Sequence, residues 1–436
     1  MEKSISKLEA IEYRRVFPWT HLFRAFRIAV DLRKIVLASA ALVALFAGDR
    51  TFRYLFTQTE SGAIEAAAHP PWKVYRSHAD SQGAISELLT DPLASLVSVS
   101  TNWSGVLQPL AGIIEPVGQL SRAESTWSEI AFCWTKLLWM LFVWAIFGGA
   151  ITRLAAVQFA RDEKVTLRAG LRFSSGRFFS YVSAPLLPLA GLGFFWLLCL
   201  VFGWMGRVPA LGGTLVGTLG FVPLLFGFVM ALILLGLAAG LPLMFPTIST
   251  EGSDAFDGFS RSYNYVFGRP WQYLGLVLLA IVYGSVVLFF VRIVVSLAVS
   301  LAGWALASGM GAAEVDALFA NVHAAPEATG TVAVAENPVF SALGPRLMGF
   351  WFDVVALLVG GFVCSYFWTA STIIYFLLRR IDDATALDEV YSPNADESDE
   401  LLPLVGVAGS DQPVIERPPP VVDESEGRPE ETAPDS

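Results

Sequence analysis

Three charged side chains, Lys136, Arg292 and Asp353, interrupt apolar stretches long enough to cross a membrane. An ionisable group inside a membrane is costly, and such residues often mark a polar site or an ion pair. Counting along each stretch places all three towards the outer face of the membrane, so we expect them to form an intramembrane polar cluster with an Arg292–Asp353 pair. Two interpretations remain open: a pocket for a solute or lipid headgroup, or charges that snorkel to the interface and hold helices together.

Residue combinations that carry catalysis are missing from the sequence. The four histidines, at positions 21, 69, 78 and 323, all lie outside the apolar stretches, and there is no zinc-protease, serine-hydrolase or phosphate-binding glycine-loop motif. The three cysteines, at positions 133, 199 and 364, have no second thiol or histidine at metal-ligand spacing. We therefore expect no enzymatic activity, no metal and no cofactor.

These three charges lie in three of six apolar stretches. The six stretches cover about residues 35–56, 130–151, 182–205, 218–246, 273–306 and 350–378. About 20 apolar residues of helix cross a hydrocarbon core of about 30 Å, and a charged fraction of 16% with mean hydropathy +0.56 is unlike a soluble protein. The sequence predicts an all-α, polytopic membrane protein with six transmembrane helices, of which the first is weakest because Asp49 and Arg50 interrupt it.

Lysine and arginine residues give the orientation of the membrane domain, residues 35–380. They are frequent in residues 1–34, in the connection between the second and third stretches and at the end of the sixth stretch. The connection between the third and fourth stretches holds only Arg207. Loops rich in Lys and Arg face the cytoplasm. We therefore expect a multi-pass protein of the cell (inner) membrane with both termini in the cytoplasm.

Residues 19–33 mix apolar and basic side chains, with an aromatic residue at the start. This pattern predicts an amphipathic helix that lies in the cytoplasmic interface and presents Leu22, Phe26, Ile28 and Val30 to the membrane. The alternative is a plain continuation of the first transmembrane helix.

Two segments before the third and fifth stretches resemble each other. The first reads Gly170-Leu-Arg-Phe-Ser-Ser-Gly-Arg-Phe-Phe-Ser-Tyr181, and the second reads Gly258-Phe-Ser-Arg-Ser-Tyr-Asn-Tyr-Val-Phe-Gly-Arg-Pro-Trp-Gln-Tyr273. Helical spacing of apolar residues predicts two amphipathic elbow helices on the membrane surface, in a parallel repeat of elbow plus helical hairpin. The side chains expected to contact lipid headgroups are Arg177, Arg269, Trp271, Tyr181 and Tyr273. Alternatively, the likeness reflects only the Arg and aromatic residues common at membrane interfaces.

The elbow pattern Gly-Leu-Arg-x-Ser followed by Arg-x-Phe is similar to that of uncharacterised bacterial multi-pass membrane families. These include families related to the membrane domain beside some glycerophosphodiester phosphodiesterases. The resemblance covers about residues 130–380, and no catalytic phosphodiesterase residues come with it. It implies an all-helical membrane domain.

Residues 381–436 hold sixteen acidic residues against two arginines and few aromatics, so we expect a disordered acidic cytoplasmic tail. An apolar island in it, made of Leu401, Leu402, Leu404 and Val405, predicts a docking motif for a cytoplasmic protein, the alternative being an idle patch.

Membrane lipids are the other expected partners. Nucleic acid is not, because topology already accounts for the basic residues. The expected function is a non-enzymatic membrane scaffold or accessory subunit, since few polar residues lie at mid-membrane depth. The alternative is a transporter or permease-like component for a small solute or lipid.

Overall fold

The computed structural model describes residues 17–56, 70–76, 103–120, 126–209, 211–315, 318 and 338–392. The chain divides into two compact units, Met1–Val390 and Tyr391–Ser436. The tail's apolar island, at Leu401, Leu402, Leu404 and Val405, lies outside the described residues, as does most of the segment predicted to be disordered. The fold below is that of the first unit.

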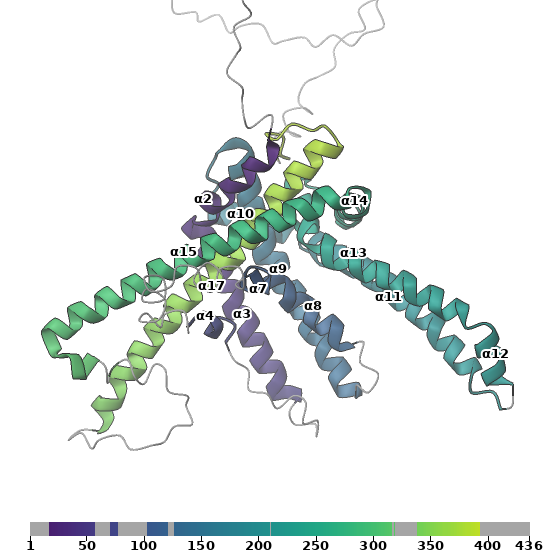
Figure 1. Cartoon of the computed structure of the whole chain (residues 1–436), viewed down its shortest axis with the longest axis horizontal. Coiled ribbons are helices and arrows are strands. Elements are labelled where there is room, and N and C mark those ends of the chain that lie inside the picture. The colour runs from purple at the N-terminus through teal and green to yellow at the C-terminus, as the bar shows by residue number, and fades with distance from the viewer. Residues whose placement is uncertain are drawn as a thin grey trace, which may run out of the picture. The chain divides into compact units, whose positions relative to one another are not determined.

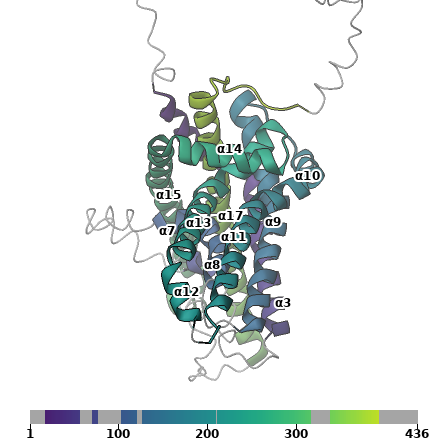
Figure 2. The same ribbon diagram turned by 90° about the vertical axis from the view of Figure 1, so that its right-hand side faces the viewer.

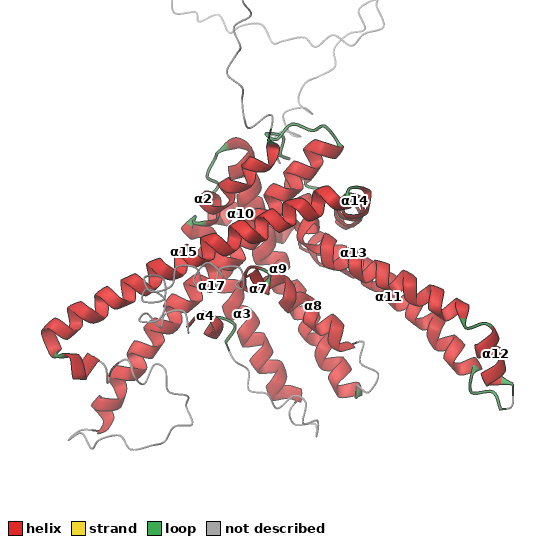
Figure 3. Cartoon of the chain, viewed as in Figure 1, coloured by secondary structure: helices red, strands yellow, loops and turns green. Residues whose placement is uncertain are grey.

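Every element among the described residues is a helix (Figure 3). Six of them are long and apolar enough to cross a membrane: α3 (Leu32–Phe56), α9 (Trp127–Arg161), α11 (Phe178–Met205), α13 (Phe221–Glu251), α15 (Pro270–Met310) and α17 (Pro338–Asp382). The prediction of an all-α, six-span membrane protein is confirmed, including the weak first span.

Shorter helices connect the spans. They are the 3-10 helix η1 (Pro18–Phe23), α2 (Arg24–Ala29), α4 (Lys73–Arg76), α7 (Trp103–Val106), α8 (Gln108–Leu120), α10 (Leu167–Gly176), α12 (Gly212–Thr218) and α14 (Ala255–Gly268). Helices α2, α10 and α14 gather at one end of the unit, called here the elbow end (Figures 1 and 2). Helix α3 starts at this end, whereas α9 ends there, so Phe56 and Trp127 mark the opposite end.

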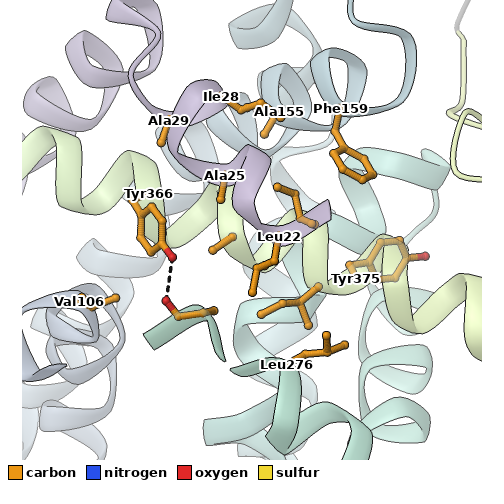
Figure 4. Close-up of a cluster of buried hydrophobic side chains, with 14 of the residues drawn as sticks. Leu22, Ala25, Ile28, Ala29, Val106, Ala155, Phe159, Leu276, Tyr366 and Tyr375 are labelled. Carbon is orange, nitrogen blue, oxygen red and sulfur yellow. Dashed lines mark hydrogen bonds between the residues drawn. The ribbon is translucent and has the colours of Figure 1, made fainter. Parts of the chain in front are cut away.

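Two of the four side chains predicted to face the membrane from residues 19–33, Leu22 and Ile28, are buried in protein, whereas Val30 is 45% exposed. The position of this segment in the cytoplasmic interface stays a prediction. Leu22, Ala25 and Ile28 have no exposed surface, because η1 and α2 pack into a protein core with α9, α15 and α17 (Figure 4). The chain is not a continuation of the first span, since it breaks at Val30 and Asp31 before α3 begins. Protein therefore covers the part of the apolar face that holds Leu22 and Ile28.

A buried lysine, Lys34, bridges the break between α2 and α3. The Lys34 side chain is almost completely buried, and its Nζ donates hydrogen bonds to the Ile28 carbonyl at 2.7 Å and to Gln158 Oε1 at 2.5 Å. The first contact satisfies a carbonyl at the end of α2, where helix geometry leaves carbonyl groups without partners. Lys34 therefore links α2, α3 and α9.

The two elbows have the same local structure. In each, the preceding span ends at a residue with left-handed backbone, Asp162 (φ 56°) or Gly252 (φ 65°). The side chain before each elbow helix then accepts a hydrogen bond from a backbone N–H of its first turn: Thr166 accepts from Ala169 at α10, and Asp254 accepts from Asp257 at α14. The repeated unit is thus span, elbow helix and span: α9, α10 and α11, then α13, α14 and α15.

Small residues allow each elbow helix to pack closely against the preceding span. A Cβ atom on Gly170 would lie 3.2 Å from Leu154, and one on Gly258 would lie 3.0 Å from Ile248. Ser174 and Ser262 follow four residues later and have no exposed surface. One face of each elbow helix is therefore packed on protein. Of the residues predicted to lie on the membrane, Ser174 is buried against protein, whereas Phe256 and Phe267 are exposed. Contact of these exposed residues with the membrane stays a prediction.

Candidate functional site

A cavity of about 500 Å³ lies between α3, α4, α8, α9 and α17. This volume falls in the range of about 300–1,000 Å³ that holds small organic ligands. Its lining consists of Leu42, Leu45, Phe46, Asp49, Phe52 and Arg53 of α3, Pro71 and Tyr75, Gln108, Pro109, Ala111, Gly112 and Glu115 of α8, Lys136, Trp139, Met140 and Trp144 of α9, and Gly360 and Cys364 of α17.

Four charged side chains gather at the end of the cavity that is farther from the elbows. Arg53 Nε lies 2.8 Å from Asp49 Oδ2, one helical turn away on α3. Lys136 Nζ lies 3.5 Å from Glu115 Oε2 and 4.0 Å from Asp49 Oδ1. Two carboxylates and two cations therefore meet within three helices, and their formal charges cancel.

One oxygen of this charged cluster lacks a hydrogen bond. Asp49 Oδ1 is buried and has no hydrogen-bond donor among the described residues, and Lys136 Nζ is beyond hydrogen-bond length. A buried polar atom without a partner costs about 1–3 kcal/mol. A ligand that supplies a donor at this position would recover part of that free energy.

The other end of the cavity is apolar and aromatic. Trp144 lies eight residues beyond Lys136 on α9, about 12 Å further along the helix axis. Only 1% of Trp144 is exposed, and its indole Nε1 has no acceptor among the described residues. Met140, Gly360 and Cys364 complete this end. The cavity therefore passes from charged to apolar over about two turns of helix.

Tyr75 forms one wall of the cavity. Its hydroxyl donates a hydrogen bond to Gln108 Oε1, which joins α4 to α8. Burial raises the pKa of the Tyr75 phenol well above its ordinary value, so the side chain remains a neutral donor at physiological pH.

Of the three charges predicted to form one cluster, the structure places only Lys136 in this cavity. Arg292 of α15 and Asp353 of α17 do not line it. Lys136 instead meets Asp49 and Glu115. A cluster of Lys136 with Arg292 and Asp353, including the Arg292–Asp353 pair, stays a prediction.

Sequence reasoning missed Asp49, Arg53 and Glu115. From the sequence, Asp49 counts only as an interruption of the first span, although its spacing of four residues from Arg53 places the two on one helix face as an ion pair. No comparable local signal marks Glu115, because it reaches Lys136 only when α8 packs on α9.

Two of the predicted headgroup contacts are wrong. Tyr181 has no exposed surface, and its hydroxyl lies 2.7 Å from Ser249 Oγ. Tyr273 is 9% exposed and donates a hydrogen bond to the Ala239 carbonyl at 2.6 Å. Both tyrosines therefore join spans to each other within the protein.

The other three residues predicted to contact headgroups, Arg177, Arg269 and Trp271, are exposed or partly exposed. Trp271 is 83% exposed. Arg177 lies over the Phe173 ring at 5.4 Å, and Arg269 Nε lies 2.7 Å from Asp382 Oδ1. Contact of these three residues with lipid headgroups stays a prediction.

A second polar network fastens the spans at the elbow end. Glu251, the last residue of α13, accepts from Arg379 Nε at 3.2 Å and from Arg261 Nη1 at 2.7 Å, and it also accepts a hydrogen bond from the Tyr375 hydroxyl. Arg379 is 9% exposed and Arg261 is 40% exposed. One carboxylate thus connects α13, α14 and α17.

Within the described parts of the chain, no three His, Cys, Asp or Glu side chains are grouped as metal ligands. All three cysteines are free thiols.

Comparison with other proteins adds no assignment to this site. The chain matches no known protein family, no curated protein and no solved structure. The resemblance of its elbow motifs to bacterial multi-pass families stays a prediction, and the function must be argued from the cavity.

Proposed function

We propose that this protein is a transporter or permease-like component that binds an amphipathic solute or lipid in the cavity between α3, α8, α9 and α17. The observation that carries the proposal is the change in polarity along that cavity. Asp49, Glu115 and Lys136 lie at one end and Trp144 and Cys364 at the other. A ligand with a polar head and an apolar body matches both ends at once.

Two groups without hydrogen-bond partners support this proposal. Asp49 Oδ1 accepts no hydrogen bond at the charged end, and Trp144 Nε1 donates none at the apolar end. Buried polar groups in folded proteins are nearly always paired. The preferred ligand therefore carries a donor, such as a hydroxyl or an ammonium group, in its head, and an acceptor such as an ester carbonyl further along its body.

The orientation of the cavity follows from the basic residues at the elbow end. We infer that this end faces the cytoplasm of a cell (inner) membrane, as the excess of Lys and Arg predicts. The charged end of the cavity then lies in the outer half of the membrane. The ligand would then bind with its polar head towards the outer face of the membrane, and it would not be chemically changed.

A membrane scaffold or accessory subunit is the second candidate function. Arg161 Nη2 donates to the Val390 carbonyl at 3.0 Å, and Arg379 Nη1 donates to the Glu389 carbonyl at 2.9 Å. These contacts fix the place where the C-terminal segment leaves the first unit. Such a fixed exit would suit a tail that recruits a cytoplasmic protein.

The test of the first proposal is to fill the cavity. Full-length wild-type protein, Ala111→Trp and Ile114→Trp are purified from native membranes in mild detergent, and the small molecules and lipids retained by each are identified by mass spectrometry. Ala111 lines the cavity, whereas Ile114 lies on the same helix and does not. An amphiphile retained by wild type and Ile114→Trp but lost from Ala111→Trp supports the proposal. Equal retention by all three proteins contradicts it.

The second candidate is tested in the same preparation. A chain ending at residue 392 keeps the contacts of Arg161 and Arg379 but lacks the tail. A protein partner that accompanies the full chain and is absent from the shortened chain would favour the scaffold function. An unchanged set of partners would count against it.

A further inference from the structure

A second depression lies at the elbow end, with no lining residue in common with the cavity described above. An open depression of about 660 Å³ is bordered by Arg24 and Arg27 of α2 and by Arg161 and Asp162 at the end of α9. Thr20, Phe23, Phe159 and Ala160 complete its lining. Three guanidinium groups and one carboxylate leave an excess of two positive charges.

The two arginines of α2 converge on one atom. Arg27 Nη2 lies 3.1 Å and Arg24 Nη2 lies 3.6 Å from the same oxygen, Asp162 Oδ1. The contact of Arg27 is also a hydrogen bond, and a guanidinium group carries five N–H donors. Asp162 and Arg27 are both about two-thirds exposed. The arrangement is a positive surface with one carboxylate in it, not a closed ion pair.

The backbone that carries these charges is held in place. Helix α2 has its apolar face in the protein core, so it has no freedom to lift away. Arg24 lies over the Phe159 ring at 5.0 Å, which fixes its direction. Asp162 is the left-handed residue that ends α9. The charges are therefore arranged before any ligand arrives, which lowers the entropic cost of binding.

We propose that this depression binds a phosphate-type anion, and that its ligand is the headgroup of an anionic phospholipid. Guanidinium groups are the preferred protein partners of phosphate because two N–H groups can meet two oxygens. Phe17, Trp19 and Phe23 beside it are each more than 40% exposed, and exposed aromatic side chains concentrate at headgroup depth. The site is independent of the proposed transport function.

The experiment uses the full-length protein in detergent and measures bound phosphatidylglycerol by native mass spectrometry, with phosphatidylcholine as the lipid without net charge. Arg27→Gln should weaken phosphatidylglycerol binding roughly tenfold, as expected for a lost charge-assisted hydrogen bond. Asp162→Asn should strengthen it, because it removes the competing carboxylate, and asparagine tolerates the left-handed backbone. Arg168→Gln, an exposed arginine of α10, is the matched control and should change nothing.

A parallel titration with inorganic phosphate, followed by the thermal stability of the protein, separates the two sources of this chemistry. Selective phosphatidylglycerol binding with the stated variant effects, and no stabilisation by millimolar phosphate, supports the lipid site. Stabilisation by free phosphate that is lost in Arg27→Gln, without lipid selectivity, would replace the lipid by a soluble anion and overturn the lipid assignment. If Arg27→Gln and Asp162→Asn both bind phosphatidylglycerol as wild type does, the proposal is wrong. Because Arg27 and Asp162 are exposed, both variants should fold.

Discussion

The carboxylate of Glu251 offers a sharp test of how the spans are joined at the elbow end. It faces two arginines of different burial: Arg379 on α17, 9% exposed, and Arg261 on α14, 40% exposed. Both lie within ion-pair distance, and the more exposed pair is the shorter one, at 2.7 Å against 3.2 Å. Distance alone would therefore rank Arg261 as the stronger partner, whereas burial ranks Arg379 first.

The magnitudes follow from solvent screening. Removing one partner of a buried ion pair costs about 3–5 kcal/mol, because it leaves a buried charge uncompensated. Glu389, 66% exposed and 3.6 Å from Arg379 Nη2, compensates part of this, so we expect about 3 kcal/mol for Glu251→Gln. An exposed pair contributes about 0.2–1 kcal/mol. The coupling energy of Glu251 with Arg379 should therefore exceed its coupling with Arg261 by about 2 kcal/mol.

Two double-mutant cycles measure these couplings. One combines Glu251→Gln with Arg379→Gln and the other combines it with Arg261→Gln, and the free energy of unfolding is determined by denaturing-detergent titration in mixed micelles. Because both cycles share Glu251→Gln, the arginine is the only difference between them. A coupling to Arg261 equal to or larger than that to Arg379 would refute the reasoning from burial.

Three further predictions concern single side chains. Gly361→Val should destabilise the protein by about 1–3 kcal/mol, because its Cβ would lie 2.9 Å from the Ile35 carbonyl and force α3 and α17 apart. The control is Gly275→Ala, which has open space around its Cβ and should leave stability unchanged. Thermal unfolding measures the stability of both variants. Lys34→Met should cost about 1–3 kcal/mol, because the buried Ile28 carbonyl and Gln158 lose their donor, and Arg168→Gln is the surface control. Burial raises the pKa of Tyr263 from 10.0 to about 12, so the folded state retains the phenol proton that the unfolded state loses. Stability should then fall as pH rises from about 10 to about 12, and an equally steep fall in Tyr263→Phe would contradict this assignment.

The architecture was readable from the sequence because it depends on local properties. Length and apolar composition are sufficient to define a span, and the elbows at Gly170 and Gly258 were visible as a repeated motif. The first span, with Asp49 and Arg50 near its end, is a full helix to Phe56. Its charges are tolerated because Asp49 pairs with Arg53 one turn later.

The candidate site was not readable because it depends on packing between distant segments. Lys136 has its partners on α3 and α8, and nothing within its own stretch indicates which helices will be neighbours. The aromatic residues misled for the same reason. Tyr181 and Tyr273 occupy equivalent positions in the two elbow motifs and are both buried, whereas Phe179 and Trp271, two residues earlier in each motif, are 80% and 83% exposed.

The most direct test of the proposed function is to look into the cavity between Lys136 and Trp144. A cryo-electron microscopy structure of the full-length protein in nanodiscs made from its native membrane lipids would show its contents. The account predicts one elongated density, with its polar end in hydrogen-bonding contact with Asp49 and its apolar end against Trp144. A cavity that is closed by side chains, or that contains only water, would contradict it.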